Sequence, residues 1–289
     1  MKKIAAFAAV ALLSSFASAQ TANDTSGADK LGWQLGVHSY TFKNFTIFEA
    51  IDKNKSLGLK HMGISGGVRL DAKRSPRTME LGEQDLQAIR KKLDEAGIKL
   101  VNMGVVQLPA DEAASRKAFE FAKKMGIDAL IAEPEPKALD TVEKLCKEYN
   151  IKVAIHNHPK PSRYWNPDTV LEALKGRTPL LGACADTGHW IRSGLDPVEC
   201  LKKLEGRIIN LHFKDLNEKA SADPKAKTRP HDVPWGTGVA DVKAMLTELK
   251  RQNFRGAFCV EYEHNWDNSL PEIAQSVKYF YQVANELAK

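Results

Sequence analysis

Acidic and imidazole side chains follow five short apolar runs in this sequence of 289 residues. The five segments read IAEP at 131–134, IHNH at 155–158, ADTGH at 185–189, LHFKD at 211–215 and VEYE at 260–263. A strand buried in a parallel sheet is nearly continuous in apolar residues, so charged groups where such a run ends need a reason. Acid–base chemistry and metal binding are the two functions that these residue types favour.

The positions of these groups along each run predict that they share one face. Side chains alternate between the two faces of a strand, and Ala154, Cys184 and Cys259 are small enough to face a crowded interior. The residue two positions later in each of these runs then faces the same way. The same counting aligns residues 133 and 212 with 131 and 210. The complete inward set is Glu133, His156, Asp186, His212 and Glu261.

Three carboxylates at one point would repel one another and raise each other's pKa values, and a divalent cation removes that cost. Oxygen-rich ligation with one or two imidazoles suits Mn²⁺, Mg²⁺ or Co²⁺ better than Zn²⁺, which prefers more nitrogen or sulfur. A single Asp or Glu at a strand end is more often a helix cap than a ligand, but capping gives no reason for five such groups to share a face. Glu263, Asp215 and His189 are assigned to loop or supporting roles.

The elements that must position these groups alternate regularly along the chain. Short apolar runs predict eight strands, at 34–42, 59–65, 98–106, 127–134, 151–158, 180–187, 208–215 and 256–263. The segments between them have apolar residues at helical spacing, with glycines such as Gly97 and Gly126 as stops and Asp196-Pro197 as a start. Eight strand–helix units predict a single (β/α)8 TIM barrel of the α/β class. An open doubly wound sheet is the alternative, but no G-x-G-x-x-G follows the first strand.

Residues 1–19 read as a secretory signal peptide, because two lysines precede an apolar run and Ala17-Ser18-Ala19 resembles a cleavage site. We therefore expect an exported protein, periplasmic or secreted, with a flexible leader at 20–31, the barrel at 32–289 and no membrane span after cleavage. The formal net charge of +6 is spread along the chain, which argues against nucleic acid as a partner. The four cysteines lack C-x-x-C spacing and are predicted to be buried thiols.

The chain resembles the xylose isomerase-like family of TIM barrels in five motifs, at 155–158, 186–190, 211–215, 233–238 and 260–263. That family includes sugar phosphate isomerases and epimerases, inosose dehydratases and apurinic endonucleases. The resemblance covers about residues 32–289 and implies one divalent metal held by a Glu, an Asp, a His and a second Glu.

The implied ligands carry over onto Asp186, His212 and Glu261. Epimerases of the family usually place the first Glu on the fifth strand, where this chain has His156. We assign the missing carboxylate to Glu133, at the end of the strand before, and keep His156 as the alternative ligand. The departure also weighs against simple ketose epimerisation, which relies on a pair of carboxylates.

A cation that chelates a carbonyl and its neighbouring hydroxyl stabilises the enediolate formed when an α-proton leaves. His156 or His158 suits the base, since imidazole is neutral near pH 7, and Lys214 suits neutralisation of the oxyanion. We therefore predict a metal-dependent sugar isomerase or epimerase with Mn²⁺ as the favoured cofactor. The alternatives are a lyase or hydratase that eliminates from a keto-glycoside at the same site, a non-catalytic sugar-binding barrel, and a metal-dependent endonuclease.

Export bears on the substrate, because phosphorylated sugars are mainly cytosolic. We expect a free or keto sugar as the small-molecule partner. Tyr40, Phe42, Trp190 and Trp235 stand near strand ends, where aromatic rings either stack on sugars or pack in the core. The segment 216–234 is the one long insertion, polar and rich in Lys, Asp and Pro, and we expect it to form a lid.

Overall fold

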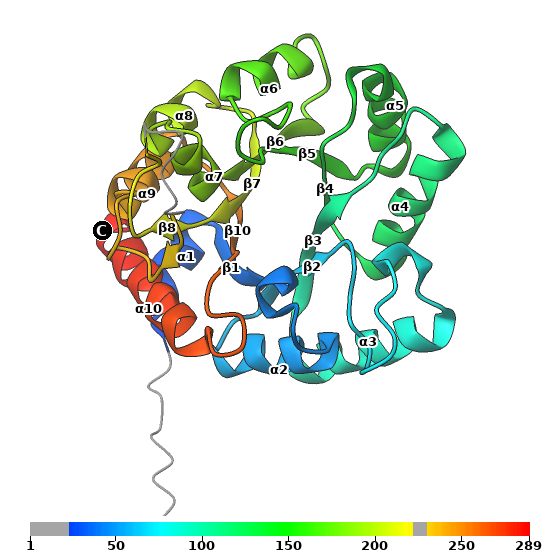
Figure 1. Cartoon of the computed structure of the whole chain (residues 1–289), viewed down its shortest axis with the longest axis horizontal. Helices are drawn as coiled ribbons and strands as arrows, with labels where there is room; N and C mark the ends of the chain where they lie inside the picture. Colours follow the sequence, from blue (N-terminus) through cyan, green and yellow to red (C-terminus); the bar gives the residue numbers. More distant parts are fainter. Residues whose placement is uncertain (1–22, 222–229) are drawn as a thin grey trace, which may run out of the picture.

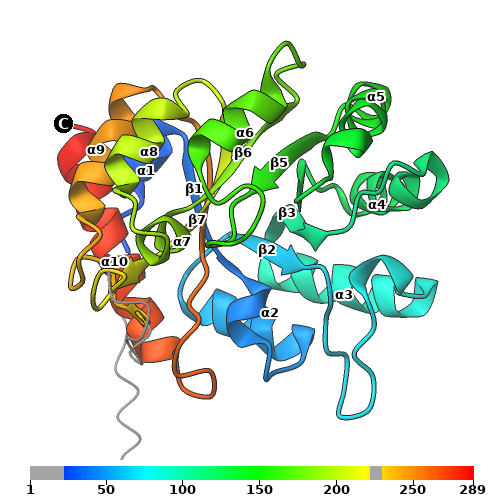
Figure 2. The same cartoon turned by 45° about the horizontal axis from the view of Figure 1, so that its top comes forward.

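Eight parallel strands close into a barrel in the computed structural model, which describes residues 23–221 and 230–289 (Figure 1). The strands pair in the order β1-β10-β7-β6-β5-β4-β3-β2, and β1 pairs with β2 to complete the ring. Helices surround the ring on its outside (Figures 1 and 2). This architecture confirms the predicted (β/α)8 barrel. The predicted signal peptide, residues 1–19, lies outside the described residues.

The barrel strands are β1 (Trp33–His38), β2 (His61–Ser65), β3 (Lys99–Val106), β4 (Ala129–Ala132), β5 (Lys152–His156), β6 (Leu181–Asp186), β7 (Ile208–Phe213) and β10 (Gly256–Val260). The α-helices are α1 (Ser26–Leu31), α2 (Ile47–Ser56), α3 (Glu83–Ala96), α4 (Glu112–Met125), α5 (Leu139–Tyr149), α6 (Pro167–Leu174), α7 (Thr187–Arg192), α8 (Pro197–Lys203), α9 (Val242–Arg251) and α10 (Leu270–Leu287). Three short 3-10 helices are η1 (Ser39–Phe42), η2 (Thr78–Glu80) and η3 (Pro136–Ala138).

All eight strands lie where the sequence predicts them, but most end earlier than expected. The predicted strand 151–158 ends at His156 in the structure, and the next residue does not continue the strand pairing. Asn157 instead pairs its side-chain amide with the backbone of Asp186, accepting the N–H at 2.8 Å and donating to the carbonyl at 2.9 Å. The polar residues of these runs thus lie at the last positions of the strands and in the loops that follow, where the active sites of such barrels are built.

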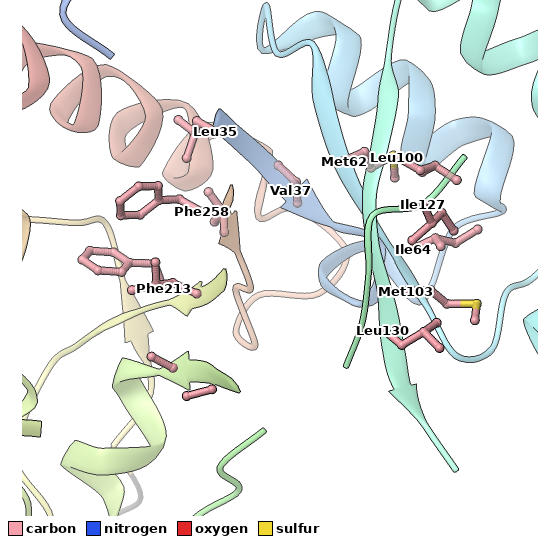
Figure 3. Close-up of a cluster of buried hydrophobic side chains, with 14 of the residues drawn as sticks. Leu35, Val37, Met62, Ile64, Leu100, Met103, Ile127, Leu130, Phe213 and Phe258 are labelled. Atoms are coloured by element: carbon pink, nitrogen blue, oxygen red, sulfur yellow. The ribbon is translucent and has the colours of Figure 1, made fainter. Parts of the chain in front are cut away.

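Alternate residues of each strand face two separate apolar layers. Outward-facing side chains such as Val37, Ile64 and Phe258 belong to one continuous core shared with the helices (Figure 3). The inward-facing side chains are smaller and form two clusters, Val101 with Ala257 and Cys259, and Ile131 with Ala154 and Cys184. This division confirms the predicted inward parity. All four cysteines are free and buried, as predicted.

The expected flexible leader at 20–31 is in part an ordered element. Residues 26–31 form helix α1, which lies beside α10 at the other end of the chain (Figure 1). Asn285 of α10 accepts the Gly27 N–H at 2.6 Å and donates to the carbonyl of Asp24 at 2.9 Å. Polar and small residues dominate this stretch, so the sequence gives no apolar pattern that marks the contact. Within the described residues, no helix is long and apolar enough to cross a membrane.

The chain between β7 and α9 forms a small antiparallel pair, β8 (Asp215–Leu216) with β9 (Asp232–Val233). The buried Asp215 carboxylate fixes the following turn, because it accepts N–H bonds of 2.9 Å from Gly236, Gly238 and Ala240. These contacts confirm the loop role predicted for Asp215. Residues 222–229 of the expected lid lie outside the described residues, so the lid stays a prediction.

Candidate metal centre and acid–base cluster

Four side chains from consecutive strands of the ring meet at the carboxyl end of the barrel. His156 ends β5, Asp186 ends β6, His212 lies in β7 and Glu261 directly follows β10. Each offers one ligand atom, and these four atoms lie within 4.8 Å of one another. All four residues are buried. The structure therefore brings together four of the five residues that the sequence predicts to face inward, and we refer to them as the quartet.

Asp186 uses its two carboxylate oxygens differently. Oδ1 accepts the backbone N–H of His189 at 2.9 Å and so caps helix α7, which begins at the next residue. Oδ2 faces the quartet and lies 3.6 Å from Nε2 of His156. Asp186 can thus cap helix α7 and face the quartet at the same time, because each role uses a separate oxygen.

Lys214 places its ammonium group between the two carboxylates of the quartet. Its Nζ donates to Oδ2 of Asp186 and to Oε2 of Glu261, and the side chain is fully buried. Glu263 lies farther away, with Oε2 at 3.8 Å from the same nitrogen. Lys214 follows His212 by two residues and shares its face, as the sequence predicts. A buried cation at this point offsets part of the repulsion between the carboxylates.

Glu133 lies outside the quartet and forms a second cluster with two histidines. Its Oε1 contacts Nδ1 of His158 and lies 3.1 Å from Nδ1 of His156. His156 therefore belongs to both clusters, with one ring nitrogen toward Glu133 and the other toward Asp186. His158 is 48% exposed, which leaves it accessible from the cavity. This pattern is typical of an imidazole oriented by a carboxylate.

His38, at the end of β1, is part of the site although the sequence analysis did not select it. Its Nδ1 lies 3.3 Å from Oε1 of Glu261, and its ring centroid lies 4.7 Å from that of His212. Gly63 of β2 makes room for this ring, because a Cβ there would lie 2.7 Å from Cδ2 of His38. The available signal was a single histidine in the middle of the first predicted strand, 34–42, which in the structure ends at this residue.

A second missed residue, Arg192, connects the site to β9. Its guanidinium donates to Glu263 at 2.7 Å and to the buried Asp232 at 2.8 Å. The same group lies 3.1 Å from Nδ1 of His189, whose Nε2 lies 3.5 Å from Oδ2 of Asp186. Glu263 and His189 thus support the site from its edge, as the sequence predicts.

The environment sets the protonation of these groups. Burial raises the pKa of the Asp186 carboxyl, but His189 and Lys214 outweigh burial and hold that pKa well below its usual range. Burial lowers the pKa of His156, but contacts with Asp186 and Glu133 outweigh it and raise the pKa to about 9. Burial lowers the pKa of His212 to about 4, against the opposing effect of Glu261. With no cation bound, His156 is therefore protonated at neutral pH and His212 is not.

The quartet fits a divalent cation on chemical grounds. Two imidazoles and two carboxylates are a donor set that Mn²⁺, Co²⁺ or Zn²⁺ accepts. Nε2 of His156 and Nε2 of His212 are buried without a hydrogen-bond partner among the described residues. Buried polar atoms in native proteins normally have a partner, so these two nitrogens point to a ligand that they bind.

A cavity of about 250 Å³ opens directly onto the site. His38, His156, His158 and Glu261 line it, with Tyr40 at its wall. Of the four aromatic residues considered for sugar stacking, Phe42, Trp190 and Trp235 are at most 2% exposed and serve the core. Tyr40 is 37% exposed and is the one that remains available to a ligand.

A family model described as a xylose isomerase-like TIM barrel matches residues 51–283. This chain belongs to the xylose isomerase-like TIM barrel family. The predicted resemblance is therefore confirmed, and the quartet and the Glu133 cluster lie in the matched part of this xylose isomerase-like barrel.

Curated relatives of the barrel carry the name inosose dehydratase. The inosose dehydratase of Clostridium tetani (strain Massachusetts / E88) is 32% identical over 160 residues, which are 51% of this chain and 53% of the relative. That of Clostridium botulinum (strain Eklund 17B / Type B) is 34% identical over 103 residues, 32% of this chain and 33% of the relative. The chain spans about half the length, or less, of these curated relatives.

Solved structures share the fold over most of the chain. A protein of Parabacteroides distasonis ATCC 8503 is 35% identical, with a TM-score of 0.67, and the match covers 87% of this chain and 99% of that one. A magnesium complex of a xylose isomerase-like barrel from Mycobacterium smegmatis is 14% identical, with a TM-score of 0.71 and coverage of 90% and 99%. The IOLI protein with a bound zinc atom is 16% identical, with a TM-score of 0.65 and coverage of 88% and 99%.

Proposed function

We propose that this barrel is an enzyme that removes the proton α to the carbonyl group of a sugar, with one divalent cation as cofactor. The observation that carries the proposal is the junction of two clusters at His156. A buried set of metal-binding atoms lies directly beside a carboxylate–imidazole pair that opens onto a cavity. Proton abstraction next to a carbonyl needs these two functions in one place.

We assign the cation to His156, Asp186, His212 and Glu261. Glu133, the carboxylate favoured from the sequence, is a weaker candidate because it forms a separate group with His156 and His158 and does not lie with the four atoms of the quartet. The magnesium and zinc complexes of two structurally similar barrels support a divalent cation, and Mn²⁺ remains our preferred ion for this donor set. A cation held there would act as a Lewis acid toward the carbonyl group of the sugar and would make the neighbouring proton easier to remove.

His158 is the base in this proposal, because His156 serves the cation. Its Nδ1 is held by Glu133, so Nε2 is left to accept a proton from a substrate in the cavity. The carboxylate fixes the orientation of the ring and stabilises the imidazolium once the proton has moved. Lys214 keeps the Asp186 and Glu261 carboxylates charged and places a positive charge close to the developing oxyanion.

The fate of the enediolate decides the reaction. Return of the proton to the neighbouring carbon or to the opposite face gives an isomerase or epimerase, the outcome favoured from the sequence. Loss of a β-substituent gives a dehydratase or lyase. The name inosose dehydratase on the curated relatives supports elimination, and so does the histidine in place of the fifth-strand glutamate of epimerases.

The test is to incubate the Mn²⁺-loaded protein with free and keto sugars in D₂O and to follow the products by NMR. Deuterium next to the carbonyl, in a product of unchanged constitution, supports isomerisation or epimerisation. Release of water or an alcohol with an unsaturated sugar supports elimination. Full activity after EDTA treatment, or no reaction with any sugar carrying a carbonyl group, contradicts the proposal.

We also propose that the protein is exported and acts on unphosphorylated sugars. The lysine pair, apolar run and Ala17-Ser18-Ala19 support this, although they lie outside the described residues. Expression of the full chain in a bacterial host, followed by fractionation and N-terminal sequencing, checks it. A mature chain that begins at Gln20 is expected. Uncleaved protein in the cytoplasm, or turnover of a sugar phosphate far above that of the free sugar, contradicts it.

A further inference from the structure

A second cavity of about 210 Å³ adjoins the one that opens onto the quartet, and Tyr40 lines both. Ser39 of η1 lines the second cavity, and Ser65 at the end of β2 lines the first. Ser39 of η1 fixes these segments to each other, because its hydroxyl accepts the N–H of Ser65 at 2.8 Å. We call the second cavity the side pocket, and it is lined by Phe42, Phe45, Ile47, Val68 and the neighbouring polar residues Lys43, Arg69 and Ser75.

The two cavities differ in chemistry. Histidines and glutamates line the cavity at the quartet. The side pocket has an apolar floor, and its charged lining residues, Lys43 and Arg69, are both basic. Such a pocket favours a group with an apolar face, and none of the described residues that line it carries a carboxylate or an imidazole.

Tyr40 stands where the two cavities meet and is 37% exposed, which is unusual for a large aromatic side chain of this protein. Its ring packs edge-on against Trp266 at 5.6 Å between centroids, and the Lys43 ammonium lies 3.5 Å from the centre of the Trp266 ring. Tyr40 thus contacts Trp266 and Lys43 while more than a third of its surface stays exposed. Rigid exposed aromatic rings of this kind are typical binding platforms.

We propose that the side pocket binds the second group of a glycoside, an aglycone with an apolar face, while the sugar ring occupies the cavity at the quartet. The assignment of the sugar ring to that cavity rests on the proposed function. The proximity of the two cavities, which share Tyr40 in their walls, their contrast in lining and the exposure of the Tyr40 ring carry the rest. A free monosaccharide would leave the side pocket unused, so the proposal names a glycoside rather than a monosaccharide as the substrate class.

Measurements of ligand binding test the proposed role of the side pocket without requiring turnover. Calorimetry compares methyl β-D-glucoside, phenyl β-D-glucoside and cellobiose on the Mn²⁺-loaded protein. Gly67→Phe is chosen to obstruct the side pocket, since Gly67 lines it and a Cβ there would have no atom nearer than 3.7 Å. Gly82→Phe is the matched control, because Gly82 lines neither cavity and a Cβ there meets nothing within 4 Å. Circular dichroism and melting of both variants verify that they fold.

We expect phenyl glucoside or cellobiose to bind at least about tenfold more tightly than methyl glucoside, the scale expected for filling an apolar pocket. Gly67→Phe should remove that preference, and its affinity for methyl glucoside should stay within about twofold of the parent protein. Gly82→Phe should keep both the preference and the affinity for methyl glucoside. If only phenyl glucoside binds more tightly than methyl glucoside, the side pocket binds an aryl aglycone. If cellobiose binds more tightly, the side pocket binds a second sugar. Equal binding of all three ligands, or a preference that survives Gly67→Phe, overturns the proposal. If the preference holds but no sugar exchanges its α-proton in D₂O, the side pocket stands and the proposed reaction falls.

Discussion

Lys214 donates to the same oxygen of Asp186, Oδ2, that faces the candidate cation position. The ammonium group and a divalent cation therefore compete for one carboxylate oxygen and, through Glu261, for a second. Lys214 therefore stabilises the metal-free protein and, because it holds the same oxygens, weakens the binding of metal.

Replacing Lys214 by Met should destabilise the metal-free protein and tighten the binding of metal. The variant leaves two buried carboxylates without their counter-ion, which costs about 3–5 kcal/mol of unfolding free energy. Added Mn²⁺ should restore most of that loss, because the cation takes over the compensation. Denaturant unfolding with EDTA and with excess Mn²⁺ measures both effects. Equal stability of variant and parent in EDTA would show that Lys214 does not compensate the pair.

Replacing Glu261 by Gln should remove most of the bound metal and the activity while the barrel stays folded. The amide keeps the shape of the side chain but not its charge. Glu263→Gln is the matched control, since Glu263 lies two residues later and contacts Arg192 rather than the quartet. Metal content by mass spectrometry and melting by circular dichroism follow the two variants. Full occupancy of Glu261→Gln would exclude Glu261 as a ligand.

The two histidines of the 155–158 motif should separate into a ligand and a base. His158→Ala should lower kcat by about 10²-fold or more with metal content unchanged, the usual scale for loss of a general base. His156→Ala should lose metal as well as activity, because His156 belongs to the quartet. Metal retained in His156→Ala together with metal lost in Glu133→Gln would return the ligand role to Glu133.

Metal binding should release a proton at neutral pH. The pKa of His156 is raised to about 9 in the metal-free protein, and an imidazole ligand must be deprotonated. Protonated His156 stabilises the metal-free fold below about pH 6.5, and this contribution disappears as the pH rises through 9. Affinity for Mn²⁺ should therefore increase with pH up to about 9. Calorimetry in two buffers of different ionisation enthalpy measures the proton, and identical heats in both would contradict the prediction.

The cysteines should be unreactive until the protein unfolds. Burial raises the pKa values of Cys146, Cys200 and Cys259 to about 12, so almost no thiolate exists at pH 8. Cys184 shifts in the same direction. Mass spectrometry after iodoacetamide treatment should find no alkylation of the native protein and four alkylated cysteines in guanidinium chloride. Rapid alkylation of the native protein would show that one of the thiols is accessible.

Much of the site follows from the sequence because strand periodicity and barrel geometry are local rules. Counting by two from Ala154, Cys184 and Cys259 was enough to place three members of the quartet on the inner face. Glu133 shows the limit of that counting. Parity gives the face on which a side chain lies, but the neighbours that it contacts depend on the path of the loop, and here they are His156 and His158.

The residues that the sequence analysis missed act across the fold. Arg192 reaches Asp232, which lies 40 positions later, and no spacing rule connects the end of a short helix with a strand after a long insertion. His38 joins Glu261 because β1 and β10 pair to close the ring. The sequence did not predict helix α1 because its contacts are also distant along the chain: its partner α10 is the last helix.

Gly63 places an evolutionary constraint on the site without touching a ligand itself. Any larger residue there would put a Cβ 2.5 Å from Oδ1 of Asn102 and 2.7 Å from the His38 ring. Asn102 and His38 would both have to move, and Glu261 would lose its contact with His38. A lineage that changed this glycine would need compensating changes at both Asn102 and His38 in the same step.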